Sequence, residues 1–214
     1  MQFNLKGVTK LETVLETKDI PIYQYSFDLR PKSFNFTQIK NIEEIISASQ
    51  DINSISLCFE NEKPQLVKEL YKRSKERAHD SQQLLLEFMG DEKIEYCEQF
   101  KLPYIWHYHE GESISSLGQA SYMQRVVFSH ALLQKYHEQN ELHGFLNLFS
   151  DYVQKIYFEV QLEWSSEIIL SIFDFFKIPV VSYEINSDVE HFYQNPDHKK
   201  IKQYYDNLSN LLKN

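Results

Sequence analysis

The feature that most constrains the fold is residues 84–100, LLLEFMGDEKIEYCEQF, which predict a strand, a turn and a helix in immediate succession. The apolar run ends at Gly90, and Asp91 and Glu92 would place carboxylates in the first helical turn, where the helix dipole favours negative charge. The apolar residues that follow recur at helical spacing: Ile94, Cys97 and Phe100. This segment therefore predicts a βα unit.

The rest of the chain alternates between the same two kinds of segment. Strands are predicted at 2–6, 22–29, 54–59, 84–89, 103–109, 145–149, 156–162 and 179–185. Helices are predicted at 10–16, 37–47, 63–78, 91–100, 117–139, 167–176 and 199–212. The longest of these helices rests on an apolar stripe: Tyr122, Val126, Phe128, Ala131, Leu132 and Tyr136.

This alternation predicts an α/β fold, because strands separated by helices form a parallel sheet and eight such units close into a barrel. We therefore expect one domain, residues 1–214, with the fold of a (βα)8 TIM barrel. Only residues 150–155 lie between the predicted sixth and seventh strands. That is too short for a crossover helix, so the sixth helix is expected to be shortened or missing.

Composition excludes several classes of function. A formal net charge of -9 argues against a surface for nucleic acid or an anionic membrane. No apolar run approaches the roughly 18 residues of a membrane span, and the first residues lack the apolar core of a signal peptide, so the expected address is cytoplasmic. Cys58 and Cys97 are interpreted as buried apolar residues rather than a disulfide or a zinc site, and no cofactor is expected.

Four short segments resemble motifs of the phosphoribosylanthranilate isomerase family, in the same order along the chain. Residues 86–92 resemble the end of its fourth strand, Val-Gln-Leu-His-Gly-Asp-Glu, of which Gly-Asp-Glu is kept. Residues 183–190 resemble Val-Asp-Val-Ser-Ser-Gly-Val-Glu, which closes the last strand and opens a phosphate-binding helix. Residues 5–9 resemble Ile-Cys-Gly-Ile-Thr, and Pro31, Lys32 and Ser33 match the turn after the second strand. The resemblance spans nearly the whole chain.

The resemblance implies an Amadori rearrangement with a Cys as general base and an Asp as general acid. Lys6 stands in place of the Cys, and we expect it to face Glu184 on the neighbouring last strand. An opposite charge keeps a lysine protonated, so Lys6 is either half of a buried ion pair or a catalytic base. The predicted sixth strand has no carboxylate, and the nearest, Asp151, is either the acid or a turn or cap residue.

The family's phosphate grip depends on glycines after strands seven and eight, whose backbone can approach a phosphate closely. This chain has five glycines, none of them after Gly144. Glu163 lies where the family has a Gly-Gly pair, and Asp188 replaces the last glycine. A carboxylate there repels a phosphate, so Ser187 or Asp188 is interpreted as a helix N-cap.

Other polar residues at predicted strand ends are candidates for ligand binding. Arg30 and Lys32 are expected to lie at the rim of the barrel and to suit a small anionic metabolite. His107 and His109 alternate on the fifth strand, so they are either part of a two-histidine, one-carboxylate metal site or ordinary outward side chains. The full set of substrate-binding candidates is Arg30, Lys32, Glu87, His107, Glu163, Asn186, Ser187 and Asp188.

Three functions follow from these observations. The first is a diverged isomerase-like barrel that has lost the reaction and serves as a binding or interaction protein, a pseudoenzyme. The second is a working isomerase of tryptophan biosynthesis. The third is an enzyme of a different substrate class. It would use residues at the mouth of the barrel, where the carboxyl ends of the strands lie: Lys6, Glu87, His107, Glu163 and Glu184. In each case we expect a monomer or a homodimer.

Overall fold

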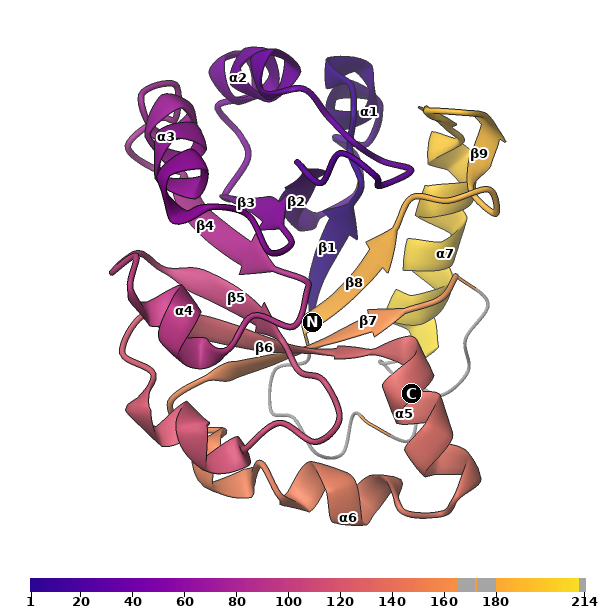
Figure 1. Ribbon diagram of the computed structural model, residues 1–214. Helices are drawn as coiled ribbons and strands as arrows, with labels where there is room; N and C mark the ends of the chain where they lie inside the picture. Colours follow the sequence, from indigo (N-terminus) through magenta and orange to yellow (C-terminus); the bar gives the residue numbers. More distant parts are fainter. Residues whose placement is uncertain (165–171, 173–179, 212–214) are drawn as a thin grey trace.

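The computed structural model describes residues 1–164, 172 and 180–211. Eight strands close into one parallel barrel in chain order, and helices surround it, with α1, α2 and α3 on one side and α5 and α6 on the other (Figure 1). The strands are β1 (Gln2–Lys6), β2 (Ile22–Asp28), β3 (Ser54–Phe59), β4 (Gln83–Phe88), β5 (Tyr104–His107), β6 (Met123–Ser129), β7 (Tyr157–Leu162) and β8 (Val180–Glu184). The predicted single-domain (βα)8 TIM barrel is confirmed.

The described helices follow the strands on the outside of the barrel. They are α1 (Leu11–Glu16), α2 (Ile39–Ala48), α3 (Pro64–Lys75), α4 (Ile94–Glu98), α5 (His130–Glu138), α6 (Leu142–Asn147) and α7 (His198–Leu211), with 3-10 turns η1 (Ile114–Gln119) and η2 (Ser150–Tyr152). After β8, a short antiparallel pair forms from β9 (Glu190–Phe192) and β10 (Asn195–Pro196). None of the helices in the described ranges is long and apolar enough to cross a membrane.

The predicted helix 117–139 is wrong, because it contains β6 and its following helix. The run Arg125 to Phe128 is buried throughout, as expected for a strand with one face in the barrel and the other against helices. The apolar part of this run, Val126 to Phe128, is too short to have a period that separates strand from helix, and the β-branched pair Val126 and Val127 was the better guide. Ser129 ends β6 and its hydroxyl caps α5 by accepting from Leu132 N at 3.3 Å.

The predicted strand 145–149 is also wrong, because these residues belong largely to α6. Leu142, Phe145, Leu146 and Phe149 are buried and follow the helical spacing i, i+3, i+4, i+7, whereas Leu148 is exposed. The sixth crossover therefore contains α5 and α6, and it is the β5–β6 connection that has only the 3-10 turn η1. The predicted helix 167–176 lies, apart from residue 172, outside the described residues.

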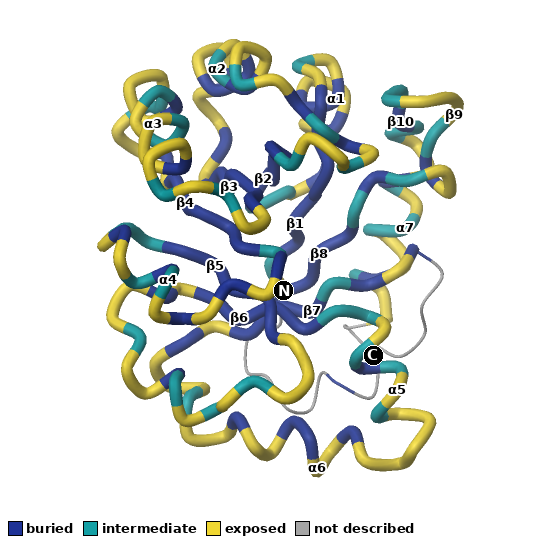
Figure 2. Tube along the Cα trace, viewed as in Figure 1, coloured by how far each residue is buried: buried dark blue, intermediate teal, exposed yellow. Residues whose placement is uncertain are grey.

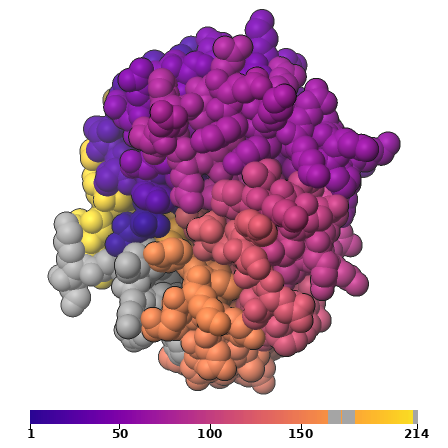
Figure 3. All heavy atoms as spheres, turned by 90° about the vertical axis from the view of Figure 1, so that its left-hand side faces the viewer, coloured from indigo at the N-terminus to yellow at the C-terminus, as the bar shows by residue number. Residues whose placement is uncertain are grey.

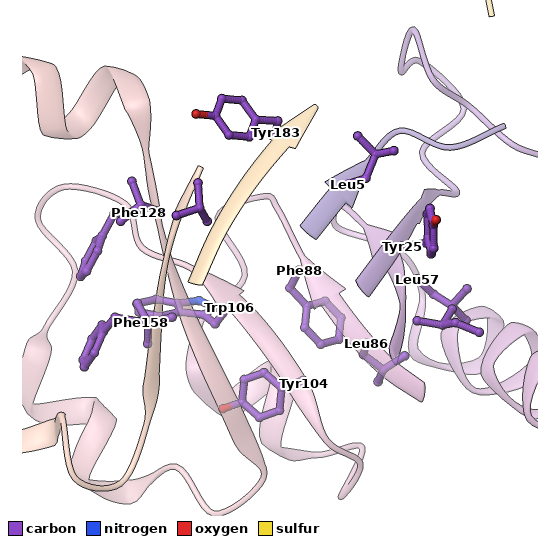
Figure 4. Packing of buried hydrophobic residues seen from close by; sticks show 14 of the residues in the cluster. Leu5, Tyr25, Leu57, Leu86, Phe88, Tyr104, Trp106, Phe128, Phe158 and Tyr183 are labelled. Carbon is purple, nitrogen blue, oxygen red and sulfur yellow. The ribbon is translucent and has the colours of Figure 1, made fainter. Parts of the chain in front are cut away.

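The main core lies between the barrel and the helices. Buried residues follow the strands and exposed residues follow the outer helices (Figure 2). Aromatic side chains from neighbouring strands fill this layer: Phe128 on β6 stacks on Phe158 on β7, with ring centroids 5.6 Å apart (Figure 4). On the face seen in Figure 3, the early and late segments of the chain adjoin directly.

The barrel interior, in contrast, is mainly polar. Barrels of this type are usually filled with branched apolar side chains, but here only Leu85, Ile105 and Val127 form a small separate apolar cluster. Most of the other buried inward positions in the described ranges carry polar or charged groups: Asn4, Lys6, Gln24, Ser26, Asp28, Ser54, Ser56, Glu87, His107, Arg125, Glu159 and Ser182. This polar filling positions the candidate site.

Candidate functional site at the barrel mouth

Lys6, at the end of β1, lies in the centre of the barrel between two buried carboxylates. Its Nζ is 2.5 Å from Glu87 Oε1 on β4 and 3.0 Å from Glu159 Oε1 on β7. The side chain of Lys6 is 3% exposed and those of both glutamates are fully buried. Charges taken out of water need partners as close as these to offset the cost of desolvation, and removing one partner leaves an uncompensated buried charge. We call Lys6, Glu87, Glu159 and Arg125 the interior charge cluster.

Arg125 on β6 completes the cluster. Its Nη1 donates to Glu159 Oε2 at 2.6 Å and to Gln24 Oε1 at 3.1 Å. Asn4 Nδ2 donates to the same Glu159 oxygen at 2.9 Å. Two cations and two carboxylates therefore balance one another, and the interior carries no net charge from these four side chains.

The pKa values within the cluster show how firmly these charges are fixed. Burial on its own lowers the pKa of Lys6, but Glu159 and Glu87 together outweigh it, and the net pKa is raised. Burial raises the pKa of Glu159, yet Lys6 and Arg125 outweigh it and bring that pKa to about 2. Lys6 is thus held as an ammonium and cannot accept a proton as a general base near neutral pH.

His107, at the end of β5, is the second partner of Glu87. Its Nε2 lies 2.8 Å from Glu87 Oε1, and the residue is 7% exposed. Burial, then the charge of Lys6, lower the pKa of His107, although the hydrogen bond to Glu87 opposes this. His107 is therefore neutral at neutral pH, and a ring that donates Nε2–H to Glu87 keeps Nδ1 as an acceptor.

The expected pairing of Lys6 with Glu184 is wrong. The two residues are neighbours in the β1–β8 register, but Lys6 binds Glu87 and Glu159 instead. Glu184 accepts long hydrogen bonds from Asn35 Nδ2 at 3.2 Å and from Gln161 Nε2 at 3.3 Å. The interior carboxylates were the nearer and better buried partners for the ammonium.

Gly7 makes room for the contact between Asn35 and Glu184. It has φ +76, and a Cβ there would lie 2.4 Å from Asn35 Nδ2. The same Asn35 nitrogen donates to Ile185 O at 2.8 Å, so Asn35 ties the loop after β2 to the end of β8. A glycine is required here both by its dihedral and by this close approach.

The rim cations expected to bind an anion are differently placed. Arg30 is engaged by Asp28, with Nη2 2.6 Å from Oδ2 and Nε 2.9 Å from Oδ1, a bidentate pair. Burial lowers the pKa of Arg30, but the hydrogen bond and charge of Asp28 outweigh it and raise the pKa. Lys32 is exposed in the following turn.

A cavity of about 300 Å³ opens at the carboxyl ends of β6, β7 and β8. Its polar lining consists of Ser129, His130, Gln161, Glu163, Glu184 and Asn186. Among the described residues that line it, none is a lysine or an arginine. We call this cavity the mouth pocket. His130 Nδ1 lies 3.5 Å from Glu163 Oε1, and the Glu163 side chain is 67% exposed.

Four other candidates lie elsewhere than predicted. Asp151 is exposed in η2, before β7 and hence at the amino end of the barrel, opposite the mouth. Ser187 and Asp188 are exposed and begin no helix: the chain turns there, with Asp188 N donating to Asn186 Oδ1, and continues into β9. The next helix, α7, is capped by Asp197. His109 is exposed whereas His107 is buried, so they share no site.

Sequence reasoning missed Arg125, Glu159 and Ser129. Glu159 was available as an inward position on the correctly predicted seventh strand, since Phe158 and Val160 flank it. Arg125 and Ser129 were hidden by the wrong helix assignment of β6. Within the described residues, no group of three or more His, Cys, Asp or Glu side chains could hold a metal ion.

The fold and the site together define a (βα)8 barrel protein whose polar groups converge at the carboxyl ends of the strands. Barrels of this class keep their ligand sites at that end. No protein-family model matches the sequence, and no curated protein sequence matches it significantly.

Solved structures show which barrels have a similar fold. The fold is similar to phosphoribosyl anthranilate isomerase from Thermus thermophilus, with a TM-score of 0.71 and 16% identity over 99% of this chain and 100% of that one. The isomerase from Thermotoga maritima matches with a TM-score of 0.71 and 17% identity over 98% and 99% of the two chains. The isomerase from Pyrococcus furiosus gives 0.65 and 15% over 98% and 99%. The chain has the fold of the phosphoribosylanthranilate isomerases, as the sequence motifs predicted.

Proposed function

We propose that this chain is an isomerase-like barrel that has lost the isomerase reaction and acts as a binding protein, a pseudoenzyme. The observation that carries this proposal is the position of Lys6 between Glu87 and Glu159. The family resemblance places a Cys general base at this residue. An ammonium clamped by two buried carboxylates cannot take over that proton transfer.

The lack of a carboxylic acid at the end of β6 supports the same conclusion. The family resemblance places an Asp at the end of strand six, and β6 ends here in Val127, Phe128 and Ser129. Ser129 Oγ is occupied as the cap of α5. A hydroxyl with an ordinary pKa is a poor proton donor compared with a carboxylic acid.

The substrate's phosphate also lacks its expected site. A neighbouring isomerase structure contains reduced 1-(o-carboxyphenylamino)-1-deoxyribulose 5-phosphate, a phosphorylated ligand. The family resemblance implies a Gly-Gly pair after strand seven. In this chain that position has Gln161, Leu162 and Glu163 instead. Glu163 and Asp188 would repel a phosphate dianion at both of its expected contacts.

The test is growth of a tryptophan auxotroph that lacks the isomerase, together with a fluorescence assay of the purified protein on phosphoribosylanthranilate. We expect neither growth without tryptophan nor turnover above background. A working isomerase serves as the positive control, and the circular dichroism spectrum shows that the protein tested is folded. Growth without tryptophan would overturn the proposal in favour of the active isomerase.

One observation favours a second candidate, an enzyme of changed substrate class. The Glu87–His107 pair orients a neutral histidine near the mouth, which is an arrangement suited to a general base. In this candidate His107 is the base, and Lys6 and Glu184 are not. A turnover screen of hydroxylated and amino metabolites with His107→Gln as the negative control separates it from the pseudoenzyme.

The cellular location, the oligomeric state and the ligand complete the proposed function. We propose a cytoplasmic protein that is a monomer or a homodimer, with a small metabolite as its ligand. Light scattering of the purified chain measures the oligomeric state directly.

A further inference from the structure

The mouth pocket differs from the interior in the way its carboxylates are neutralised. Glu87 and Glu159 each have a cation within 3.0 Å. Glu184 is partly buried. Among the residues in the described ranges it forms no ion pair and receives two long hydrogen bonds, both from amides. Arg30 acts on it weakly, because Asp28 already holds that guanidinium.

A partly buried carboxylate that has no cationic partner in the protein favours binding of a ligand that carries a positive charge. At a few ångströms, opposite charges attract with several kcal/mol when they are shielded from water, and like charges repel equally. The mouth pocket places a second carboxylate, that of Glu163, in the same lining. An anionic ligand would meet two carboxylates there. No lysine or arginine lies in the described lining, and its basic side chain, His130, is already 3.5 Å from Glu163 Oε1.

We infer that the mouth pocket binds a small organic cation, a primary amine or a guanidinium. Glu184 is its counter-ion, and Glu163 is a second, more exposed one. The amide oxygen of Gln161 supplies a neutral acceptor for the other N–H groups or for hydroxyl groups of the ligand, and so does the second lone pair of the Ser129 hydroxyl, whose first accepts from Leu132 N. This inference deepens the proposed function and rests on it, since the pocket lies where the family resemblance implies a phosphate.

The size and position of the pocket agree with this ligand class. A cavity of about 300 Å³ lies at the lower end of the range for small-molecule sites. It opens at the carboxyl ends of β6, β7 and β8, the side on which barrels of this class bind ligands. The Asn35 contact fixes the Glu184 carboxylate before a ligand arrives, which reduces the entropy lost on binding.

The experiment is calorimetric titration of the full chain with agmatine, putrescine and ethanolamine, and separately with inorganic phosphate and ribose 5-phosphate. We expect heat of binding with at least one amine, weakened by added salt, and none with the two phosphates. Glu184→Gln removes the charge and keeps the side-chain shape, and it should weaken amine binding by about tenfold or more. Glu112→Gln, at another part of the mouth and outside the pocket, is the matched control and should bind as the wild type does.

Glu163→Gln provides a second test, because its exposed side chain can change without affecting folding. It should weaken amine binding by less than Glu184→Gln does. No amine binding to the wild type, phosphate binding, or equal affinity of Glu184→Gln and wild type would each overturn the inference. A chain that catalyses the isomerase reaction and also binds amines would contradict only the proposed function. A chain that lacks the isomerase reaction and binds no amine would contradict only this inference.

Discussion

The interior charge cluster and the mouth pocket use the same residue types to opposite effect. In the interior, Glu87 and Glu159 meet Lys6 and Arg125 at 2.5 to 3.0 Å and are shut off from solvent. At the mouth, Glu184 and Glu163 are partly exposed and have no lysine or arginine partner among the described residues. The comparison teaches that carboxylates paired with buried cations stabilise the barrel, whereas carboxylates without a lysine or arginine partner are free to meet a ligand.

The largest expected effect is the loss of the central cation. Lys6→Met leaves Glu87 and Glu159 buried beside each other without their shared ammonium, and we expect it to lower the free energy of unfolding by about 3–5 kcal/mol. Urea denaturation measures this. Lys135→Met, which removes an exposed partner of Glu110, is the control and should change little. A Lys6→Met protein as stable as the wild type would show that the cluster is not structural.

The second effect is the response of stability to acid. The pKa of Glu159 is about 2 in the folded protein, below its value in the unfolded chain. A carboxylate with a lowered folded pKa contributes stability that is present above the unfolded pKa, about 4.3, and is lost as the pH falls toward the folded pKa. Glu87, whose pKa is also lowered by Lys6 against the effect of burial, acts in the same direction.

The free energy of unfolding should therefore fall as the pH is lowered from about 4.5 toward 2. His107 should add an earlier loss below about pH 6.5, because its pKa is lowered on folding and the buried ring resists protonation. Denaturation curves at a series of pH values measure both. In Glu159→Gln the slope below pH 4.5 should be smaller, and an unchanged slope would contradict the assignment to Glu159.

The third effect connects the two regions. Gly7→Ala places a Cβ 2.4 Å from Asn35 Nδ2 and holds a non-glycine residue at φ +76, so we expect a loss of about 1–3 kcal/mol. It should also weaken ligand binding at the mouth, because Asn35 holds Glu184. Gly111→Ala has a positive φ but open space around the added Cβ, and it is the control for the dihedral alone. Equal losses in both variants would exclude the steric contribution of Asn35.

The sequence predicted the barrel well for physical reasons that hold locally. Strands 2–6 and 54–59 were predicted with their observed bounds, since short runs between turns carry a clear period. The prediction failed between 117 and 149, where β6 has apolar residues on both faces, Val127 inward and Val126 and Phe128 outward, and α6 is short. In both elements the hydrophobic pattern covers too few residues to distinguish a strand from a helix.

The site was predictable only in part, because local sequence patterns do not show which side chains of distant strands form ion pairs. Lys6 was correctly singled out, but its partners are 81 and 153 residues away and were decided by which inward side chains reach the barrel axis. Glu184 was the neighbour in register, and register alone gave the wrong ion pair. In a closed barrel, inward side chains of non-adjacent strands meet at the centre, which no nearest-neighbour argument captures.

The smallest expected effect is the removal of the mouth charge, and it tests the comparison most sharply. Glu184→Gln keeps a side chain of the same shape beside Asn35 and Gln161. Its amide oxygen still accepts one of the two long hydrogen bonds that these residues donate and the other is lost, so we expect a change in the free energy of unfolding below about 1 kcal/mol. Glu159→Gln, an equivalent change in the interior, should cost several times more, because it leaves Arg125 and Lys6 sharing fewer buried negative charges. Urea denaturation of the two variants side by side measures the ratio. Equal losses would mean that Glu184 is a structural group like Glu159, and the mouth would then have no unsatisfied charge to offer a ligand.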